Sequence, residues 1–69
     1  MEYEFIAFQT GQKWKTQMGK VFIIKEIRHE DEYPLVCISM DSGKKYFFDE
    51  DGYEVAGYPT DNDLVENIS

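Results

Sequence analysis

The feature that most constrains this chain is the spacing of its apolar residues. They alternate with polar ones in short runs and never follow one helical face over three turns. In the run Lys13–Met18, Trp14, Thr16 and Met18 would lie on one face of a strand and the lysines on the other. Gly19 and other turn-forming residues interrupt the runs. This pattern predicts short β-strands joined by tight turns.

The run Val21–Ile27 is rich in β-branched and aromatic residues, and both of its faces are apolar. Phe22 and Ile24 share one predicted face. The other face carries three aliphatic residues: Val21, Ile23 and Ile27. Such a run is typical of a strand in the centre of a sheet, or of one whose second face meets a partner.

Six segments are predicted strands: residues 2–8, 13–18, 21–27, 35–40, 45–48 and 53–56. Thr60, with Asp63 three residues later, predicts a capped helical turn, and residues 64–68 form either its end or a last strand. We therefore expect one all-β domain over residues 1–69. It is a small SH3-like barrel or, alternatively, a strongly curved antiparallel sheet of five to six short strands, with one helical turn near the C-terminus. Because so small a core is marginal, a homo-oligomer is also an open alternative.

Three features indicate a soluble cytoplasmic protein. Met1 is not followed by the charged leader and apolar segment of a secretory signal. The longest apolar run, Val21–Ile24, is far too short to span a membrane. Cys37 is the only cysteine, which excludes an intrachain disulfide and suits a reducing compartment.

The net charge of −7 is unevenly distributed. Residues 1–28 carry five basic and three acidic side chains, whereas residues 29–69 carry two basic and eleven acidic ones. Direct nucleic-acid binding is not expected, because neutralising phosphates requires a strongly basic face. An acidic second half favours a partner with a basic surface, although the same charge also keeps a small protein soluble.

Few residues are suited to catalysis or to metal binding. His29 is the single histidine, and Cys37 lies among apolar strand residues, where a buried structural thiol is the better interpretation. Asp49–Gly52 is similar to part of a calcium loop, but Phe47 and Tyr58 would then stand where the loop needs carboxylates. No pairs of cysteine and histidine suggest zinc. We expect neither an enzyme nor a cofactor or metal.

The acidic and aromatic residues of the second half are the first candidate binding surface. Tyrosine combines apolar area with a polar tip and is common in protein interfaces, although core packing is the simpler role for some of these tyrosines. The predicted protein-binding residues are Glu30, Asp31, Glu32, Asp49, Glu50, Asp51, Tyr53 and Tyr58.

The alternative is a pocket in the first half of the chain, in which an oligomer would hold a small nucleotide. Lysines would bind the phosphate and aromatic side chains would stack on the base, unless the lysines are ordinary exposed strand positions. The residues of this alternative are Lys13, Trp14, Lys15, Lys20 and Tyr46.

The chain also resembles a group of small, largely uncharacterised proteins encoded by bacteriophages and prophages. Their outline is W-x-T-R-x-G, then Y-P-[IL]-V, a D-G turn and D-L-V. Here it reads Trp14–Gly19 with Gln17 in place of the arginine, then Tyr33–Val36, Asp51-Gly52 and Asp63–Val65. The resemblance covers roughly residues 13–66 and implies a phage protein acting in the bacterial cytoplasm. Such a protein would inhibit a host protein, for example one of an anti-phage defence system. Sequestration of a nucleotide and a purely structural role are the alternatives.

Overall fold

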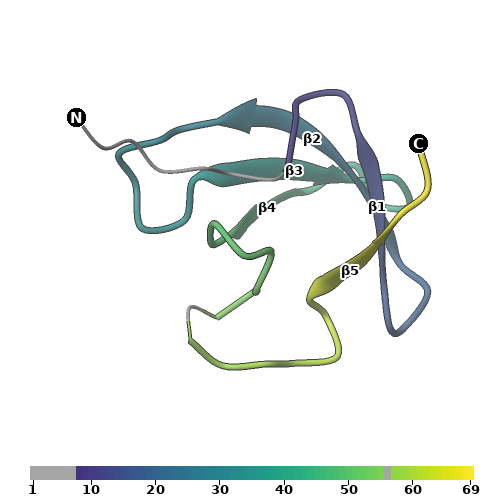
Figure 1. Cartoon of the computed structure of the whole chain (residues 1–69). Helices are drawn as coiled ribbons and strands as arrows, with labels where there is room; N and C mark the ends of the chain where they lie inside the picture. Colours follow the sequence, from purple (N-terminus) through teal and green to yellow (C-terminus); the bar gives the residue numbers. More distant parts are fainter. Residues whose placement is uncertain (1–7, 56) are drawn as a thin grey trace.

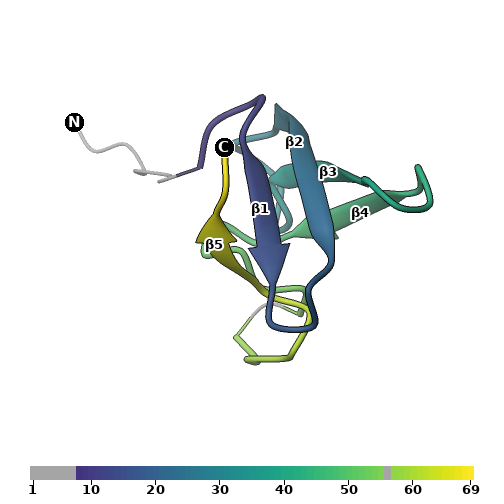
Figure 2. The ribbon, with the colours of Figure 1, turned by 90° about the vertical axis from the view of Figure 1, so that its right-hand side faces the viewer.

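The computed structural model describes residues 8–55 and 57–69, in which five β-strands form one sheet (Figure 1). These strands are β1 (Lys13–Thr16), β2 (Val21–Ile27), β3 (Leu35–Ser39), β4 (Lys45–Phe48) and β5 (Leu64–Asn67). All neighbours are antiparallel, in the order β4-β3-β2-β1-β5. The first four strands form a meander, and β5 returns to pair with β1 (Figure 2). The predicted all-β class is confirmed.

Four of the predicted segments contain strands, and two of these, 21–27 and 45–48, have the predicted bounds. Of the predicted strand 53–56, the described residues 53–55 do not form a strand: Val55 makes an isolated bridge with Tyr58. Ala56 lies outside the described residues. Of the two alternatives for residues 64–68, the last strand is correct. The predicted strand 2–8 lies, except for Phe8, outside the described residues.

The predicted helical turn after Thr60 is wrong, and the described residues contain no helix. One half of a capping box is present, because the Thr60 N–H donates to Asp63 Oδ2 at 2.7 Å. Thr60 Oγ1 accepts from the Asn62 N–H at 3.2 Å, one residue before the position that a capping box uses. The chain then extends, because the next residue, Leu64, pairs with Thr16 and begins β5. The motif therefore caps a turn that leads into a strand.

An irregularity in β2 changes which side chains face the core. Ile24 pairs with Cys37, but Glu26 pairs with Val36, so the register shifts around Lys25. A β-bulge of this kind turns the residues that follow it to the other face. Ile27 consequently packs against the core, so its predicted place beside Val21 and Ile23 is wrong.

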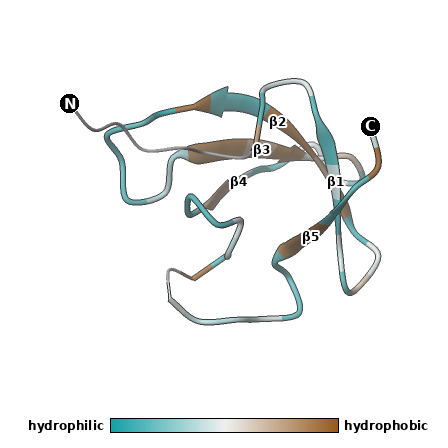
Figure 3. Ribbon diagram, viewed as in Figure 1, coloured by the Kyte–Doolittle hydropathy of each residue, from teal (hydrophilic) through white to brown (hydrophobic). Residues whose placement is uncertain are grey.

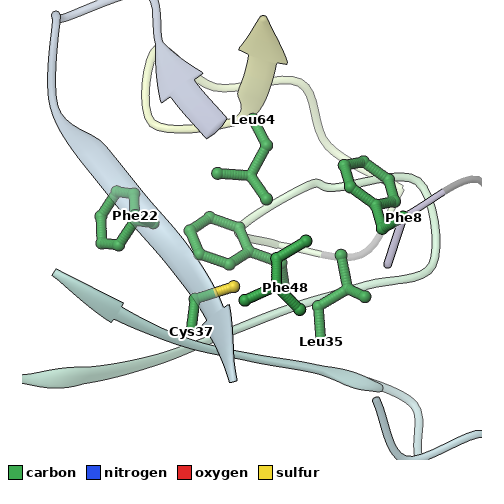
Figure 4. Close-up of a cluster of buried hydrophobic side chains, with 7 residues drawn as sticks. Phe8, Phe22, Leu35, Cys37, Phe48 and Leu64 are labelled. Atoms are coloured by element: carbon green, nitrogen blue, oxygen red, sulfur yellow. The ribbon is translucent and has the colours of Figure 1, made fainter. Parts of the chain in front are cut away.

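The hydrophobic core lies on the concave face of the sheet. Figure 4 shows its side chains converging from different strands and from the segment before β1. Figure 3 shows hydrophobic residues in β2, β3, β4 and β5, whereas β1 and the connections are largely hydrophilic. Burial raises the pKa of the Cys37 thiol to about 12, so at neutral pH it is a protonated core side chain. The buried cluster comprises Phe8, Phe22, Ile24, Leu35, Cys37, Phe48 and Leu64, against which Trp14, Ile27 and Tyr46 pack.

The edge strands β4 and β5 do not pair with each other, so strand pairing does not close the sheet into a barrel. The connection between them, residues 49–63, links the two edges instead. The Leu64 N–H donates to the Gly52 carbonyl at 2.9 Å. Gly52 has a φ of +84°, and a Cβ built on it would lie 2.7 Å from Cζ of Phe8. Only glycine fits this crossing without displacing the core.

Candidate protein-binding surface

Two acidic segments lie at the same end of the sheet. Leu35, the first residue of β3, pairs with Phe48, the last residue of β4. The loop 28–34 and the segment 49–52 therefore leave the sheet at one end. We call their exposed carboxylates the acidic end; they belong to Glu30, Asp31, Glu32, Glu50 and Asp51.

The loop 28–34 is held by its backbone and leaves its acids exposed. The Arg28 N–H donates to the Pro34 carbonyl at 2.7 Å, and the Asp31 N–H donates to the Arg28 carbonyl at 3.1 Å. The Arg28 guanidinium pairs with Glu26 of β2, with Nε 3.3 Å from Oε2. Because this cation is directed at β2, it does not neutralise the three carboxylates at the loop tip.

Asp49 is not part of this exposed surface, contrary to the prediction. Its side chain is buried, and its Oδ1 accepts the N–H groups of Asp51 at 2.9 Å and Tyr53 at 2.8 Å. The Asp49 N–H in turn donates to the Tyr53 carbonyl at 2.9 Å. This carboxylate therefore stabilises the turn after β4 and is not available to a partner.

The two predicted tyrosines have different environments. Tyr58 is 70 % exposed, and its N–H donates to the Val55 carbonyl at 2.9 Å to close a turn. Tyr53 is half-buried and lines a hollow of about 300 Å³ together with Pro59 and Asp61. Tyr58 is therefore the tyrosine most accessible to a partner on this connection.

Asp63 is a second acid that serves the fold. It is buried and accepts the Glu54 N–H at 3.0 Å, the Thr60 N–H at 2.7 Å and the Thr60 hydroxyl at 2.9 Å. Burial by itself raises the pKa of Asp63, but these hydrogen bonds outweigh it and lower the pKa below its usual value. The spacing Thr60-x-x-Asp63 indicated the bonds to Thr60, whereas the bond to Glu54 joins positions nine apart and had no sequence signal.

The five residues of the nucleotide alternative do not converge within one chain. Lys20 and Tyr46 line a hollow of about 180 Å³, but Asp41 and Glu54 also line it and would repel a phosphate. Trp14 packs on Phe8, with ring centroids 4.5 Å apart, and its Nε1–H donates to Gln12 Oε1 at 2.9 Å. The remaining two residues, Lys13 and Lys15, lie on the opposite face of β1 from Trp14.

In the part of the chain that the structure describes, no three His, Cys, Asp or Glu side chains gather as a metal site. Within the same residues, no helix is long and apolar enough to cross a membrane. Comparisons with protein-family models, with curated proteins and with solved structures gave no match to this chain.

Proposed function

We propose that this chain is a non-enzymatic, phage-encoded binding protein, which inhibits a bacterial host protein by occupying a basic surface with its acidic end. The observation that carries the proposal is the placement of two acidic segments, 28–34 and 49–52, at the same end of the β3–β4 hairpin that separates them in sequence. The residue pattern shared with small phage proteins supports the phage origin.

Gathering like charges costs free energy in the unbound protein. The repulsion among five exposed carboxylates is screened by water and salt, and a basic partner would relieve it further. Complementary charge speeds association and excludes wrong partners more than it raises affinity. We also propose that Tyr58, which is exposed on the connection 49–63, contacts the same partner and supplies apolar area that the carboxylates lack.

We also propose that the fold is SH3-like. The return of β5 to the free edge of β1 supports this, as does the crossing at Gly52, which joins the two edges of the sheet. In this arrangement the loops at one end of the sheet form the binding surface. Their sequence can vary without altering the hydrophobic core that supports them.

The experiment is capture from a bacterial lysate on the immobilised protein, followed by measurement of affinity and activity with the isolated partner. The wild type should bind a basic protein, lower its activity and release it as the salt concentration rises. The double variant Glu30→Lys/Glu32→Lys should lose at least tenfold in affinity. The matched control Asp41→Lys/Glu66→Lys, with the same change in net charge at exposed sites elsewhere, should retain it.

Three results would contradict the proposal. Equal loss of affinity in both double variants would mean that net charge, and not the acidic end, determines binding. Capture without any effect on the partner's activity would remove the inhibitory role. Thermal stabilisation by one member of a nucleotide panel, abolished by Lys20→Ala and without protein capture, would replace the proposal by nucleotide sequestration.

A further inference from the structure

The convex face of the sheet carries an apolar patch that the core does not use. Antiparallel pairing places Ile38 of β3 beside Ile23 of β2 on this face, and both side chains are half-buried. Val21 is also half-buried, and Phe47 of β4 is 45 % exposed. We call these four residues the convex patch: Val21, Ile23, Ile38 and Phe47. It corresponds to the second apolar face in the sequence of β2.

Lysines flank the convex patch on both sides. Lys45 of β4 pairs with Ile38, and Lys13 of β1 pairs with Ile23, so one row across four strands reads Lys45, Ile38, Ile23, Lys13. Paired residues share a face, and both lysines are exposed. Lys15 extends the flank on β1, where Glu66 of β5 pairs with it. Along this row the face is thus apolar at its centre and basic at both margins. Farther along the strands, Phe47, the buried Val36 and Glu26 form a second row on the same face, and the Glu26 carboxylate there is ion-paired with Arg28.

The spacing of the two flanks limits what fits between them. Three strand separations of about 4.8 Å place the backbones of Lys13 and Lys45 about 14 Å apart. A helix with its side chains is about 10–12 Å wide. A helix lying along β2 and β3 would cover Ile23 and Ile38 and bring side chains on both of its sides within reach of the lysines.

We propose that the convex patch binds an amphipathic helix of a partner protein, whose apolar stripe is bordered on both sides by acidic residues. Charge complementarity selects this occupant, because acidic side chains on the two borders of the helix would meet Lys45 on one side and Lys13 on the other. This site is separate from the acidic end: the convex patch would bind an acidic helix, whereas the acidic end would bind a basic surface.

A second copy of this chain is a poorer occupant. In a face-to-face dimer, a two-fold axis along the strands would place Lys13 of one copy against Lys45 of the other, and an axis along the row would place each lysine against its own counterpart. Four lysines would be brought together with no acidic residue in that row. Like charges opposed in this way disfavour the dimer.

The test uses a synthetic 18-residue helical peptide with a leucine stripe bordered by glutamates, and a second peptide with lysines in place of the glutamates. Titrations of the full chain are followed by NMR of isoleucine methyl groups. Ile23 and Ile38 report on the convex patch, and Ile24, next to Ile23 in sequence but buried in the core, is the internal control. The glutamate peptide should shift the first two resonances and leave Ile24 nearly unchanged.

Two charge variants test whether the glutamate peptide binds at the convex patch or is attracted to any lysine on the surface. The double variant Lys13→Glu/Lys45→Glu should bind the glutamate peptide with at least tenfold lower affinity. Lys20→Glu/Lys44→Glu makes the same change in net charge away from the patch, because Lys20 lines a hollow with Phe22 and Ser39 of the concave face and Lys44 lies opposite Ser39. The affinity of this variant for the glutamate peptide should change less than twofold. Unchanged Ile24 shifts in both variants show that the fold is retained.

Four results would overturn the proposal. The first is equal binding of the lysine peptide, and the second is no binding of the glutamate peptide. The third is binding that shifts other methyl groups but not those of Ile23 and Ile38. The fourth is a dimer in sedimentation whose dissociation moves those two resonances, because a second copy would then be the occupant.

Discussion

The two acidic segments of this protein differ in what their carboxylates contact. In the loop 28–34 all three acids are exposed, and the loop is held by backbone hydrogen bonds. In the connection 49–63, Asp49 and Asp63 are buried and accept backbone N–H groups. An acidic composition therefore has two uses here. Exposed acids of the loop 28–34, with Glu50 and Asp51, supply a surface, whereas the buried Asp49 and Asp63 hold the irregular connection through hydrogen bonds. The distinction depends on where N–H donors lie, which charge counts do not reveal.

The largest effect should come from the connection, at Gly52. Gly52→Ala forces a left-handed backbone on a residue with a Cβ and places that atom 2.7 Å from Phe8. We expect a loss of about 2–4 kcal/mol in the free energy of unfolding. Gly43→Ala is the matched control, because Gly43 has a similar φ of +74° but nothing within 4 Å of the added atom. Urea unfolding followed by Trp14 fluorescence measures both, and equal losses would refute the role of the crossing.

A smaller loss is expected for Asp63→Asn. An amide cannot accept all three hydrogen bonds, because its NH₂ group takes the place of one carboxylate oxygen and, as a donor, would face the N–H of either Thr60 or Glu54. The free energy of unfolding should fall by about 2 kcal/mol. Asp61→Asn, on the same turn but exposed, should change it by less than about 0.5 kcal/mol. If the two substitutions were equivalent, the buried carboxylate would have no special part in the fold.

The pH dependence of stability should distinguish the two segments further. The pKa of Asp63 is lower in the folded protein than in the unfolded chain, where it is about 3.9. Its stabilising contribution is therefore complete above the unfolded pKa and is lost as the pH falls through the folded pKa. The difference in unfolding free energy between wild type and Asp63→Asn should be constant near neutral pH and shrink below about pH 4. A difference that stays constant down to pH 2 would contradict this assignment.

The smallest effect is expected in the loop 28–34. The triple variant Glu30→Gln/Asp31→Asn/Glu32→Gln removes three charges that face water, so the free energy of unfolding should change by less than about 0.5 kcal/mol. Lower repulsion should make any change stabilising. Chemical denaturation at low salt is the measurement. A loss above 1 kcal/mol would show that this loop, like the connection, uses its acids to hold the fold.

The strands could be predicted where the local residue pattern favours the same structure as pairing with the neighbouring strand. In Val21–Ile27 and Lys45–Phe48, β-branched or aromatic residues and the flanking turn residues act within a few positions, so the sequence alone indicates their bounds. The place of Ile27 could not be predicted in this way. It depends on a bulge that appears only when β2 pairs with β3.

Residues 53–68 show the same limit. The cap at Thr60 is local and was predictable, but the strand that follows it forms because β1 offers a free edge to Leu64. The candidate binding surface likewise contains residues whose exposure could be predicted from the sequence and one whose burial could not. The exposed acids of the loop 28–34 follow from composition, whereas the burial of Asp49 required knowledge of which N–H groups surround it. The lysine margins of the convex patch become visible only once four strands are in register.

The pairing of β1 with β5 sets the order in which the protein can mature during translation. Lys13–Thr16 is among the first described segments to leave the ribosome, but its partner Leu64–Asn67 emerges some fifty residues later. Until then the nascent meander lacks the side chain of Leu64 in its core and keeps one edge of β1 unpaired. An unpaired edge is a site where chaperones or other nascent chains can add a strand. The final strand therefore both completes the sheet and ends the period in which the growing chain is most open to misassembly.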